Sequence, residues 1–390
     1  MKKSTSTILK HMGQDLINKS ANPAVVRAST VFFKSMQALI KQNEIVKKKK
    51  PFHYYDYGRY GSNTTIELQN IIKELEQAYH VFLTPTGFGA VALCFLGLGR
   101  PGDEFVVSDN VYQPTKDICN TYLKELGIKT KFYNPEDLND LKQKISNKTK
   151  LIFVENPGSN TFEFQDLKKI ISLAKRKKIF TILDNTWGTP LYLQPLKIGF
   201  DVSISSATKY FSGHSDAMGG TMSVNQRVYK KVYLVNKLMG YRLAPDEAYL
   251  IIRGLRTLDI RLKAHHNNVI KVIKFLKKNK KIREILYPHK PTSKNYKMWK
   301  KYYSGSTGLL GILIKSNSKA SVVKFVNSLK LFGIGYSWGG FESLVVHQDI
   351  AKKRYFWKYQ PNEHIVRMHI GLEDPADLIN DLKQALKHIK

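Results

Sequence analysis

The chain has 390 residues, of which 42% are hydrophobic and 11% aromatic, and its 63 basic and 31 acidic side chains give a formal net charge of +32. A chain of this length and composition can bury a large core in two or three domain-sized units, which excludes disorder over most of its length. No apolar run reaches the roughly 18 residues of a membrane-spanning helix and the first residues form no hydrophobic signal, so we expect a cytoplasmic protein without a membrane partner.

The positive charge raises nucleic-acid binding as a function class, because lysine and arginine neutralise phosphates. The basic residues form short runs at 47–50, 175–178 and 277–281, without a ribonucleoprotein motif, a paired-histidine zinc finger or a basic zipper. We therefore expect solvated faces and no nucleic-acid partner, with a basic nucleic-acid-binding protein as the alternative. Cys94 and Cys119 lack a metal-ligand spacing, which predicts two buried free thiols.

The first 50 residues are expected to form amphipathic helical pieces, followed by an aromatic, glycine-containing arm at 51–61. From residue 64, helices alternate with short apolar strands. The predicted strands are 81–83, 105–107, 151–154, 180–183 and 202–205, and the predicted helices are 65–79, 115–126 and 167–174. This order predicts an α/β fold with a mainly parallel sheet flanked by helices, in which ligands bind at the carboxyl ends of the strands.

The second half of the chain is predicted to be more helical and to end in a smaller α+β region. Helices are expected at 248–262, 269–276 and 319–329, and strands at 309–314 and 366–370. We predict three units: an N-terminal helical arm and inter-subunit loop at 1–60, an α/β domain at 61–255 and a C-terminal α+β domain at 256–390.

Three predicted strands are followed by polar groups whose chemistry fits together. Asp184 ends one strand, Ser206, Thr208 and Lys209 follow the next, and a turn at Gly87 opens a helix after the first. A lysine beside an apolar strand loses hydration, which favours the neutral amine and makes it a Schiff-base candidate. The hydroxyls and the glycine turn suit an anion, and the carboxylate suits a protonated ring nitrogen. These are the groups that pyridoxal 5'-phosphate requires of a protein; a structural Lys–Asp ion pair is the alternative.

Five separated stretches resemble the Cys/Met-metabolism family of pyridoxal-phosphate enzymes of fold type I. They are residues 184–187, 206–210, 213–218, 336–343 and 366–374, and the likeness extends from about residue 55 to the end. The last two stretches are similar to the β-lyase branch of that family. The resemblance implies a fold type I, PLP-transferase-like architecture, pyridoxal phosphate as cofactor, a small amino-acid substrate and a homotetramer with shared active sites.

The activity that the resemblance implies is β-elimination, which splits L-cystathionine into homocysteine, pyruvate and ammonia in methionine biosynthesis. The same family includes γ-synthases, γ-lyases, sulfhydrylases and general cysteine-conjugate β-lyases, and these stay open as alternatives. Fold alone does not select among them.

The resemblance also implies how matching residues bind the cofactor. Lys209 would hold it covalently, Asp184 would pair with the pyridine nitrogen, and Tyr112 would stack on the ring. The phosphate would contact Gly87, Phe88, Ser206 and Thr208, together with Tyr57 and Arg59 of a neighbouring subunit.

On the substrate side, the resemblance implies that Arg367 clamps the α-carboxylate with its two-pronged guanidinium. Ser337, Trp338 and Tyr57 would line the same pocket, and Asp117 would face the distal ammonium group. Lys209 would remove the Cα proton, and either Lys209 or Tyr112 would protonate the leaving sulfur.

Three other patterns point weakly to other chemistry. The turn at Gly87, with Asp109 twenty residues after Gly89, matches a dinucleotide-binding fingerprint. Residues 213–217 are one glycine short of a serine-hydrolase elbow. His265, His266 and His347 lack metal-ligand spacing, so we expect no metal site.

Overall fold

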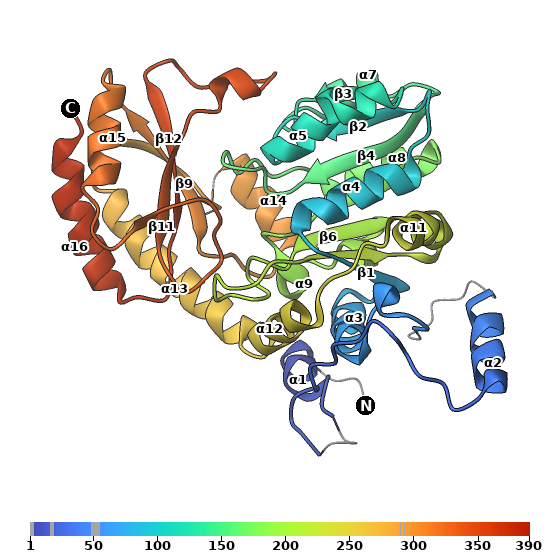
Figure 1. Ribbon diagram of the computed structural model, residues 1–390. Coiled ribbons are helices and arrows are strands. Elements are labelled where there is room, and N and C mark those ends of the chain that lie inside the picture. The colour runs from blue at the N-terminus through green and yellow to red at the C-terminus, as the bar shows by residue number, and fades with distance from the viewer. Residues whose placement is uncertain (1–3, 16–18, 48–54, 289, 292) are drawn as a thin grey trace.

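Figure 1 shows the computed structural model, which describes residues 4–15, 19–47, 55–288, 290–291 and 293–390. The α-helices are α1 (Thr5–His11), α2 (Met36–Lys47), α3 (Asn63–Glu76), α4 (Gly87–Leu98), α5 (Gln113–Asn120), α6 (Tyr122–Glu125), α7 (Leu138–Lys144), α8 (Leu167–Arg176), α9 (Thr189–Tyr192), α10 (Pro195–Ile198), α11 (Gln226–Met239), α12 (Pro245–Leu255), α13 (Leu258–Leu276), α14 (Lys294–Tyr302), α15 (Lys319–Asn327) and α16 (Pro375–Ala385). The strands are β1 (His80–Thr84), β2 (Glu104–Ser108), β3 (Lys129–Tyr133), β4 (Thr149–Glu155), β5 (Phe180–Asp184), β6 (Val202–Ser206), β7 (Gly220–Val224), β8 (Ile282–Leu286), β9 (Leu309–Lys315), β10 (Gly333–Ile334), β11 (Leu344–Gln348) and β12 (Glu363–His369).

The larger sheet has seven strands in the order β1-β7-β6-β5-β4-β2-β3. The pairs from β6 to β3 are parallel, and β7 runs antiparallel to both of its neighbours, β1 and β6. Strand β1 therefore points the same way as β6. As a result, the carboxyl ends of β1, β6, β5, β4 and β2 meet at one edge of the sheet, where open α/β sheets bind ligands.

Both faces of the central strands are buried, which is why β2, β4 and β5 are largely apolar. On one face, Phe105, Phe153 and Ile182 pack with the helices α4 and α11. On the other, Ile152 and Val154 join a core shared with α8 and the C-terminal strands. The alternation of side chains along each strand produces this division.

A second sheet of five strands, in the order β10-β11-β12-β9-β8, lies in the C-terminal part of the chain. Only the short β10–β11 pair is parallel. Figure 1 shows α13, α15 and α16 beside this sheet, and α2 standing away from both sheets at the lower right. One hydrophobic core joins residues of both sheets, so the two parts pack directly on each other.

The predicted mainly parallel α/β sheet and the smaller C-terminal α+β region are confirmed. Some predicted helices are wrong in extent: 115–126 is interrupted at Thr121, and 248–262 is interrupted at Arg256 and Thr257. At the first break the Thr121 hydroxyl donates to the Asp117 carbonyl at 2.6 Å, a local bond that competes with helix continuation. The domain limits 60/61 and 255/256 stay predictions.

Two other expectations concern single features. Cys94 and Cys119 are buried and free, as expected. In the part of the chain that the structure describes, no helix combines the length and apolar character needed to cross a membrane. The aromatic arm falls partly outside the described residues, which resume at residue 55.

Candidate active site

The strand-end residues meet as the topology requires, and Lys209 lies at their centre. It follows β6, and its Nζ donates a 2.6 Å hydrogen bond to Ser337 Oγ from the C-terminal part of the chain. The ammonium also lies 5.7 Å from the centre of the Trp338 ring. Burial lowers the pKa of Lys209 to about 8, the Arg367 charge acts in the same direction, and Asp184 opposes them. The neutral amine is therefore far more abundant near neutral pH than in an ordinary lysine.

Asp184 ends β5 beside the end of β6, and it is held in place by its own turn. The backbone N–H and the hydroxyl of Thr186 donate to Asp184 Oδ1 at 3.0 and 2.6 Å. Burial raises the pKa of Asp184, while the Thr186 bonds and the Lys209 charge lower it. The side chain keeps some exposure, so a carboxylate oxygen remains available to a ligand at the strand edge.

The start of helix α4 forms the anion side of the site. Its N-cap Thr86 accepts from Gly89 N at 2.9 Å, and the first N–H groups of a helix have no partner within it. A Cβ on Gly87 would lie 2.5 Å from Ser206 Cβ and Oγ. Only glycine lets the start of α4 approach the end of β6 this closely, so the free N–H groups and the Ser206 hydroxyl share one space.

Two further predicted phosphate contacts have other neighbours in the structure. The Thr208 hydroxyl donates to Gly219 O at 3.3 Å and accepts from Gly219 N at 3.1 Å. The Phe88 side chain packs against the core between the sheet, α4 and α11. The Phe88 ring therefore packs on the core, and the backbone N–H is the Phe88 group left for a phosphate contact.

Tyr112 is the N-cap residue of α5, with half of its surface exposed. Its backbone N–H donates to Glu155 Oε2 at 2.6 Å. Burial raises the pKa of the phenol, Glu155 and Asp184 act in the same direction, and Arg367 opposes them. The ring thus lies within electrostatic range of Asp184 and Arg367 and keeps its proton at neutral pH.

Arg367 on β12 supplies the cationic end of the site. Its Nη2 donates to Ser337 O at 3.0 Å, so Ser337 joins Arg367 through its carbonyl and Lys209 through its hydroxyl. Ser337 has a left-handed backbone with φ +78°. The loop after it packs on the backbone of the lysine: a Cβ on Gly339 would lie 3.1 Å from Lys209 Cα.

Three predicted site residues are not joined to this group by any contact among the described residues. Arg59 lines a cleft beside α11, and its guanidinium lies 5.2 Å from the centre of the Tyr57 ring. Asp117 is exposed on α5 and accepts from Gln113 Nε2 at 2.7 Å.

The alternative patterns have other partners in the structure. Asp109 is buried in an ion pair with Lys116, so it does not face a nucleotide site. Ser215 donates to Glu342 Oε1 at 2.5 Å, so its hydroxyl is engaged by a carboxylate. Among the described residues, no three His, Cys, Asp or Glu side chains gather as metal ligands would.

Sequence reasoning missed Glu155, the residue that ends β4 and pairs in register with Asp184 of β5. Burial raises the pKa of Glu155 well above its ordinary value, and the neighbouring Asp184 charge adds to this. The same signal that identified Asp184, a carboxylate ending an apolar strand, was available for Glu155.

Comparisons with known proteins agree with this geometry. The family model described as Cys/Met metabolism PLP-dependent enzyme matches residues 4–387. A putative cystathionine beta-lyase of Rhizobium johnstonii is 37% identical over 385 residues, covering 97% of this chain and 95% of that protein. The cystathionine beta-lyase of Bordetella avium is 35% identical and covers 98% of both. An L-alanine/L-glutamate racemase of Wolbachia pipientis is 34% identical, covering 95% of this chain and 93% of that protein.

Solved structures share the whole fold. The cystathionine gamma-lyase of Lactobacillus plantarum superimposes with a TM-score of 0.89 at 26% identity, covering 99% of both chains. A putative O-acetylhomoserine (thiol)-lyase of Campylobacter jejuni gives a TM-score of 0.90 at 25% identity, covering 99% of this chain and 100% of that one. The latter structure contains a pyridoxyl-lysine monophosphate group.

The residues of this chain fit pyridoxal phosphate. The desolvated amine of Lys209 suits its aldehyde, and the space that glycine leaves between α4 and Ser206 suits its phosphate. Both hydrogen bonds described for Asp184 go to Oδ1, which leaves Oδ2 for a protonated ring nitrogen. The chemistry of this donor set is that of a pyridoxal-phosphate site.

Proposed function

Since the chain belongs to the Cys/Met metabolism family of PLP-dependent enzymes, we propose that it cleaves L-cystathionine by β-elimination to homocysteine, pyruvate and ammonia. The observation that carries the proposal is the desolvated Lys209 amine, held by Ser337 between Asp184 and Arg367. The relatives named cystathionine beta-lyase, which match nearly the full chain, support the choice of substrate.

When bound, pyridoxal phosphate supplies an electron sink for the charge left when a proton leaves the substrate Cα. Asp184 would hold the ring nitrogen protonated, which deepens that sink. Gly87 and Phe88, through their backbone N–H groups, and Ser206, through its hydroxyl, would bind the phosphate. Thr208 would complete this side of the site.

The neutral form of the Lys209 amine is the base that takes the Cα proton, since burial has already lowered its pKa to about 8. Arg367 binds the α-carboxylate and thereby orients the Cα–H bond. Trp338 borders the same space. Tyr112, whose phenol keeps its proton, is the donor we propose for the departing sulfur.

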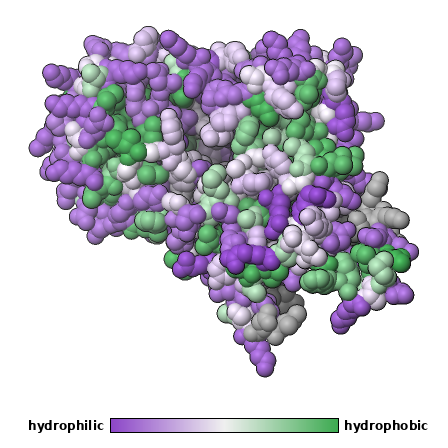
Figure 2. Space-filling model, in the orientation of Figure 1, coloured by the Kyte–Doolittle hydropathy of each residue, from purple (hydrophilic) through white to green (hydrophobic). Residues whose placement is uncertain are grey.

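We further propose a homotetramer in which one subunit's Tyr57 and Arg59 complete the cofactor and substrate site of another. The arm that carries them has unusually exposed apolar side chains: Phe32 is 93% exposed, Met36 64% and Ile40 54%. Figure 2 shows apolar side chains over the α2 region at the lower right.

Two further assignments belong to the proposal. Asp117 would contact the distal ammonium group of the substrate. A cytoplasmic location fits the free thiols of Cys94 and Cys119.

Product analysis with L-cystathionine tests the proposal. Pyruvate and homocysteine in equal amounts are expected from the wild-type protein, and neither from Lys209→Ala. Formation of 2-oxobutyrate and cysteine would instead identify γ-cleavage and refute β-elimination as the main reaction.

The racemase relative from Wolbachia pipientis favours a second candidate function, racemisation of alanine or glutamate. Racemisation requires one proton to leave Cα and another to return, and Lys209 and Tyr112 are the groups available for both steps. Chiral analysis of L-alanine and L-glutamate after incubation with the protein tests it. If neither D-enantiomer forms while cystathionine is cleaved, racemisation is excluded.

A further inference from the structure

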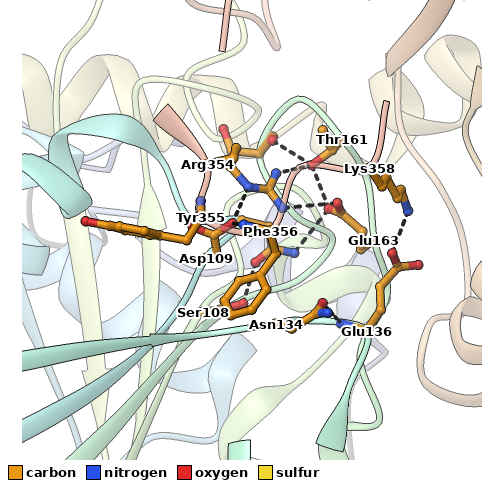
Figure 3. A network of polar contacts seen from close by, with 12 residues as sticks. Ser108, Asp109, Asn134, Glu136, Thr161, Glu163, Arg354, Tyr355, Phe356 and Lys358 are labelled. Atoms are coloured by element: carbon orange, nitrogen blue, oxygen red, sulfur yellow. Dashed lines mark hydrogen bonds and ion pairs between the residues drawn. The ribbon is translucent and has the colours of Figure 1, made fainter. Parts of the chain in front are cut away.

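A buried group of charges outside the site joins two distant parts of the chain. It consists of Asp109, Lys116, Glu163 and Arg354, named here the Asp109 cluster. Figure 3 shows Asp109, Glu163 and Arg354 of this cluster. Asp109 follows β2 and Lys116 lies on α5, whereas Arg354 belongs to the loop between β11 and β12. The cluster therefore ties a loop of the C-terminal sheet to the segment that carries Tyr112.

Asp109 is the centre of the cluster. Arg354 Nε donates to its Oδ2 at 2.8 Å, and Lys116 Nζ bonds its Oδ1. The backbone N–H groups of Tyr355 and Phe356 donate to the two oxygens at 3.1 Å each. One fully buried carboxylate thus fixes three consecutive residues of the loop.

The ammonium group of Lys116 is surrounded by hydrogen-bond acceptors and aromatic rings. Besides bonding Asp109, it donates to the carbonyl of Lys353 at 2.7 Å. Its ammonium lies 5.4 Å from the centre of the Phe132 ring and 5.2 Å from that of Tyr355. These two rings stack at 5.1 Å, so the cation is enclosed by aromatic surface.

Arg354 also reaches the segment after β4, where Nη1 donates to Thr161 Oγ1 at 2.7 Å and Nη2 to Glu163 Oε1 at 3.3 Å. Two carboxylates thus face two cations. Burial by itself raises the pKa of Asp109, but the bonds and charges of Lys116 and Arg354 hold it below its ordinary value. Removing one member would leave a buried charge without compensation, which is strongly unfavourable.

Tyr112 lies between the two anchored residues Asp109 and Lys116. Its carbonyl accepts from Thr115 N at 2.9 Å and from Lys116 N at 3.4 Å, and its N–H donates to Glu155. The backbone of this residue is thus fixed on both sides, while half of the residue's surface stays exposed.

We propose that Arg354 is a positioning residue that acts through Asp109 and Lys116 to hold the Tyr112 ring over the cofactor. The proposal rests on the assignment of Tyr112 to the cofactor ring in the proposed function. It makes the active-site geometry depend on a loop that belongs to the other sheet.

The test compares Arg354→Met, which removes the charge at similar length, with Arg354→Lys, which keeps the charge but loses the guanidinium fork. Each protein is loaded with pyridoxal phosphate, and the circular dichroism of the bound cofactor is recorded together with kcat and KM for cystathionine. We expect an altered cofactor band and a kcat lower by roughly ten- to a hundredfold for Arg354→Met, with partial recovery in Arg354→Lys. Lys352→Ala is the matched control, because Lys352 is an exposed cation of the same loop.

A double-mutant cycle with Tyr112→Ala separates positioning from stability. If Arg354 acts through the Tyr112 ring, its replacement changes the cofactor band little once the ring is absent. A folded Arg354→Met with a wild-type band, or effects that simply add to those of Tyr112→Ala, would overturn the proposal. If Arg354→Met does not fold, Arg354→Lys serves as the test. A lower thermal midpoint of Arg354→Lys together with an unchanged cofactor band would also overturn the proposal.

The cofactor readout keeps this inference distinct from the proposed substrate. A wild-type protein that binds pyridoxal phosphate but leaves cystathionine intact would refute the proposed function, and the band shifts would still test the role of Arg354.

Discussion

Lys209 illustrates how one side chain acquires its reactivity from its position. The sequence places it after an apolar strand, and the structure adds the Ser337 hydroxyl and the Arg367 charge, neither of which is near it in sequence. Burial and a neighbouring cation both favour the neutral amine, so the pKa of about 8 has two independent causes.

The rate at which the cofactor-free protein takes up pyridoxal phosphate should follow the neutral fraction of Lys209. Since the amine reacts only when deprotonated, we expect the rate to rise as the pH approaches about 8 and to level off above it. Stopped-flow absorbance across this range measures the profile. Arg367→Gln removes the nearby charge and should shift the midpoint to higher pH; a midpoint that moves down would contradict this cause.

Arg354 marks the limit of prediction at the residue scale, whereas Glu155 carried the same strand-end signal as Asp184 and was overlooked. Asp184, Lys209, Tyr112, Ser337 and Arg367 do come together, although their roles stay proposals. Arg354 carries no signal in the sequence, because its partners Asp109 and Glu163 lie roughly two hundred residues away along the chain.

At the scale of elements, the start of α4 depends on one close approach. Gly87→Ala would push a methyl group against Ser206, so we expect α4 to move from the end of β6 and the retention of pyridoxal phosphate to fall by about tenfold or more. Equilibrium dialysis of the cofactor measures the loss. Gly335→Ala is the matched control, since its Cβ would meet nothing within 4 Å. Equal losses of cofactor in both variants would argue against a phosphate site at the start of α4.

Helix α3 carries a buried carboxyl that affects stability. Glu76 is 2% exposed, its Oε1 accepts from Ser203 Oγ at 2.9 Å, and burial raises its pKa to about 8 from the ordinary 4.5. The folded state therefore favours the protonated Glu76 carboxyl. Its contribution to the free energy of unfolding is fully present below pH 4.5 and is lost as the pH rises through about 8.

The variant Glu76→Gln should remove this part of the pH dependence and gain stability relative to the wild type above pH 8, by on the order of a few kcal/mol. Denaturant unfolding at several pH values checks it. Glu74→Gln, on the exposed side of the same helix, should leave the profile unchanged. A steeper loss of stability with pH in Glu76→Gln would contradict the assigned ionisation.

In the larger sheet, sequence reasoning missed the strands β3 and β7. Strand β7 contains Gly220, Thr221 and Ser223 and has no apolar run, yet it lies between β1 and β6, where Thr221 and Ser223 are buried. Its conformation is set by pairing with two neighbours, a non-local effect that a window of sequence does not contain.

At the scale of the whole molecule, Tyr57 and Arg59 have no described contact with the Lys209 site of their own chain. If they complete a neighbour's site, two inactive variants should restore each other. Mixing Lys209→Ala with Arg59→Ala after reversible dissociation should recover roughly a quarter of wild-type activity, because random hybrids contain one intact site.

Activity of the mixture, compared with each variant alone and with the two mixed without dissociation, measures the effect. Activity that recovers in the undissociated mixture, or that fails to recover after the exchange of subunits has been verified, would rule out the shared site. Of the basic runs expected on solvated faces, 175–178 is exposed, whereas in 277–281 Lys281 is half-buried and donates to the Leu386 carbonyl at 3.3 Å. The run 47–50 lies almost wholly outside the described residues.

By itself, the sequence determined the fold class and the lysine, carboxylate and glycine turn at the strand ends, because hydrophobic periodicity and loss of hydration are local properties. Only the tertiary structure decided that Ser337 and Arg367 meet Lys209, that β7 enters the larger sheet and that Arg354 neutralises Asp109. Those outcomes depend on which distant segments pack together, and no local pattern records that choice.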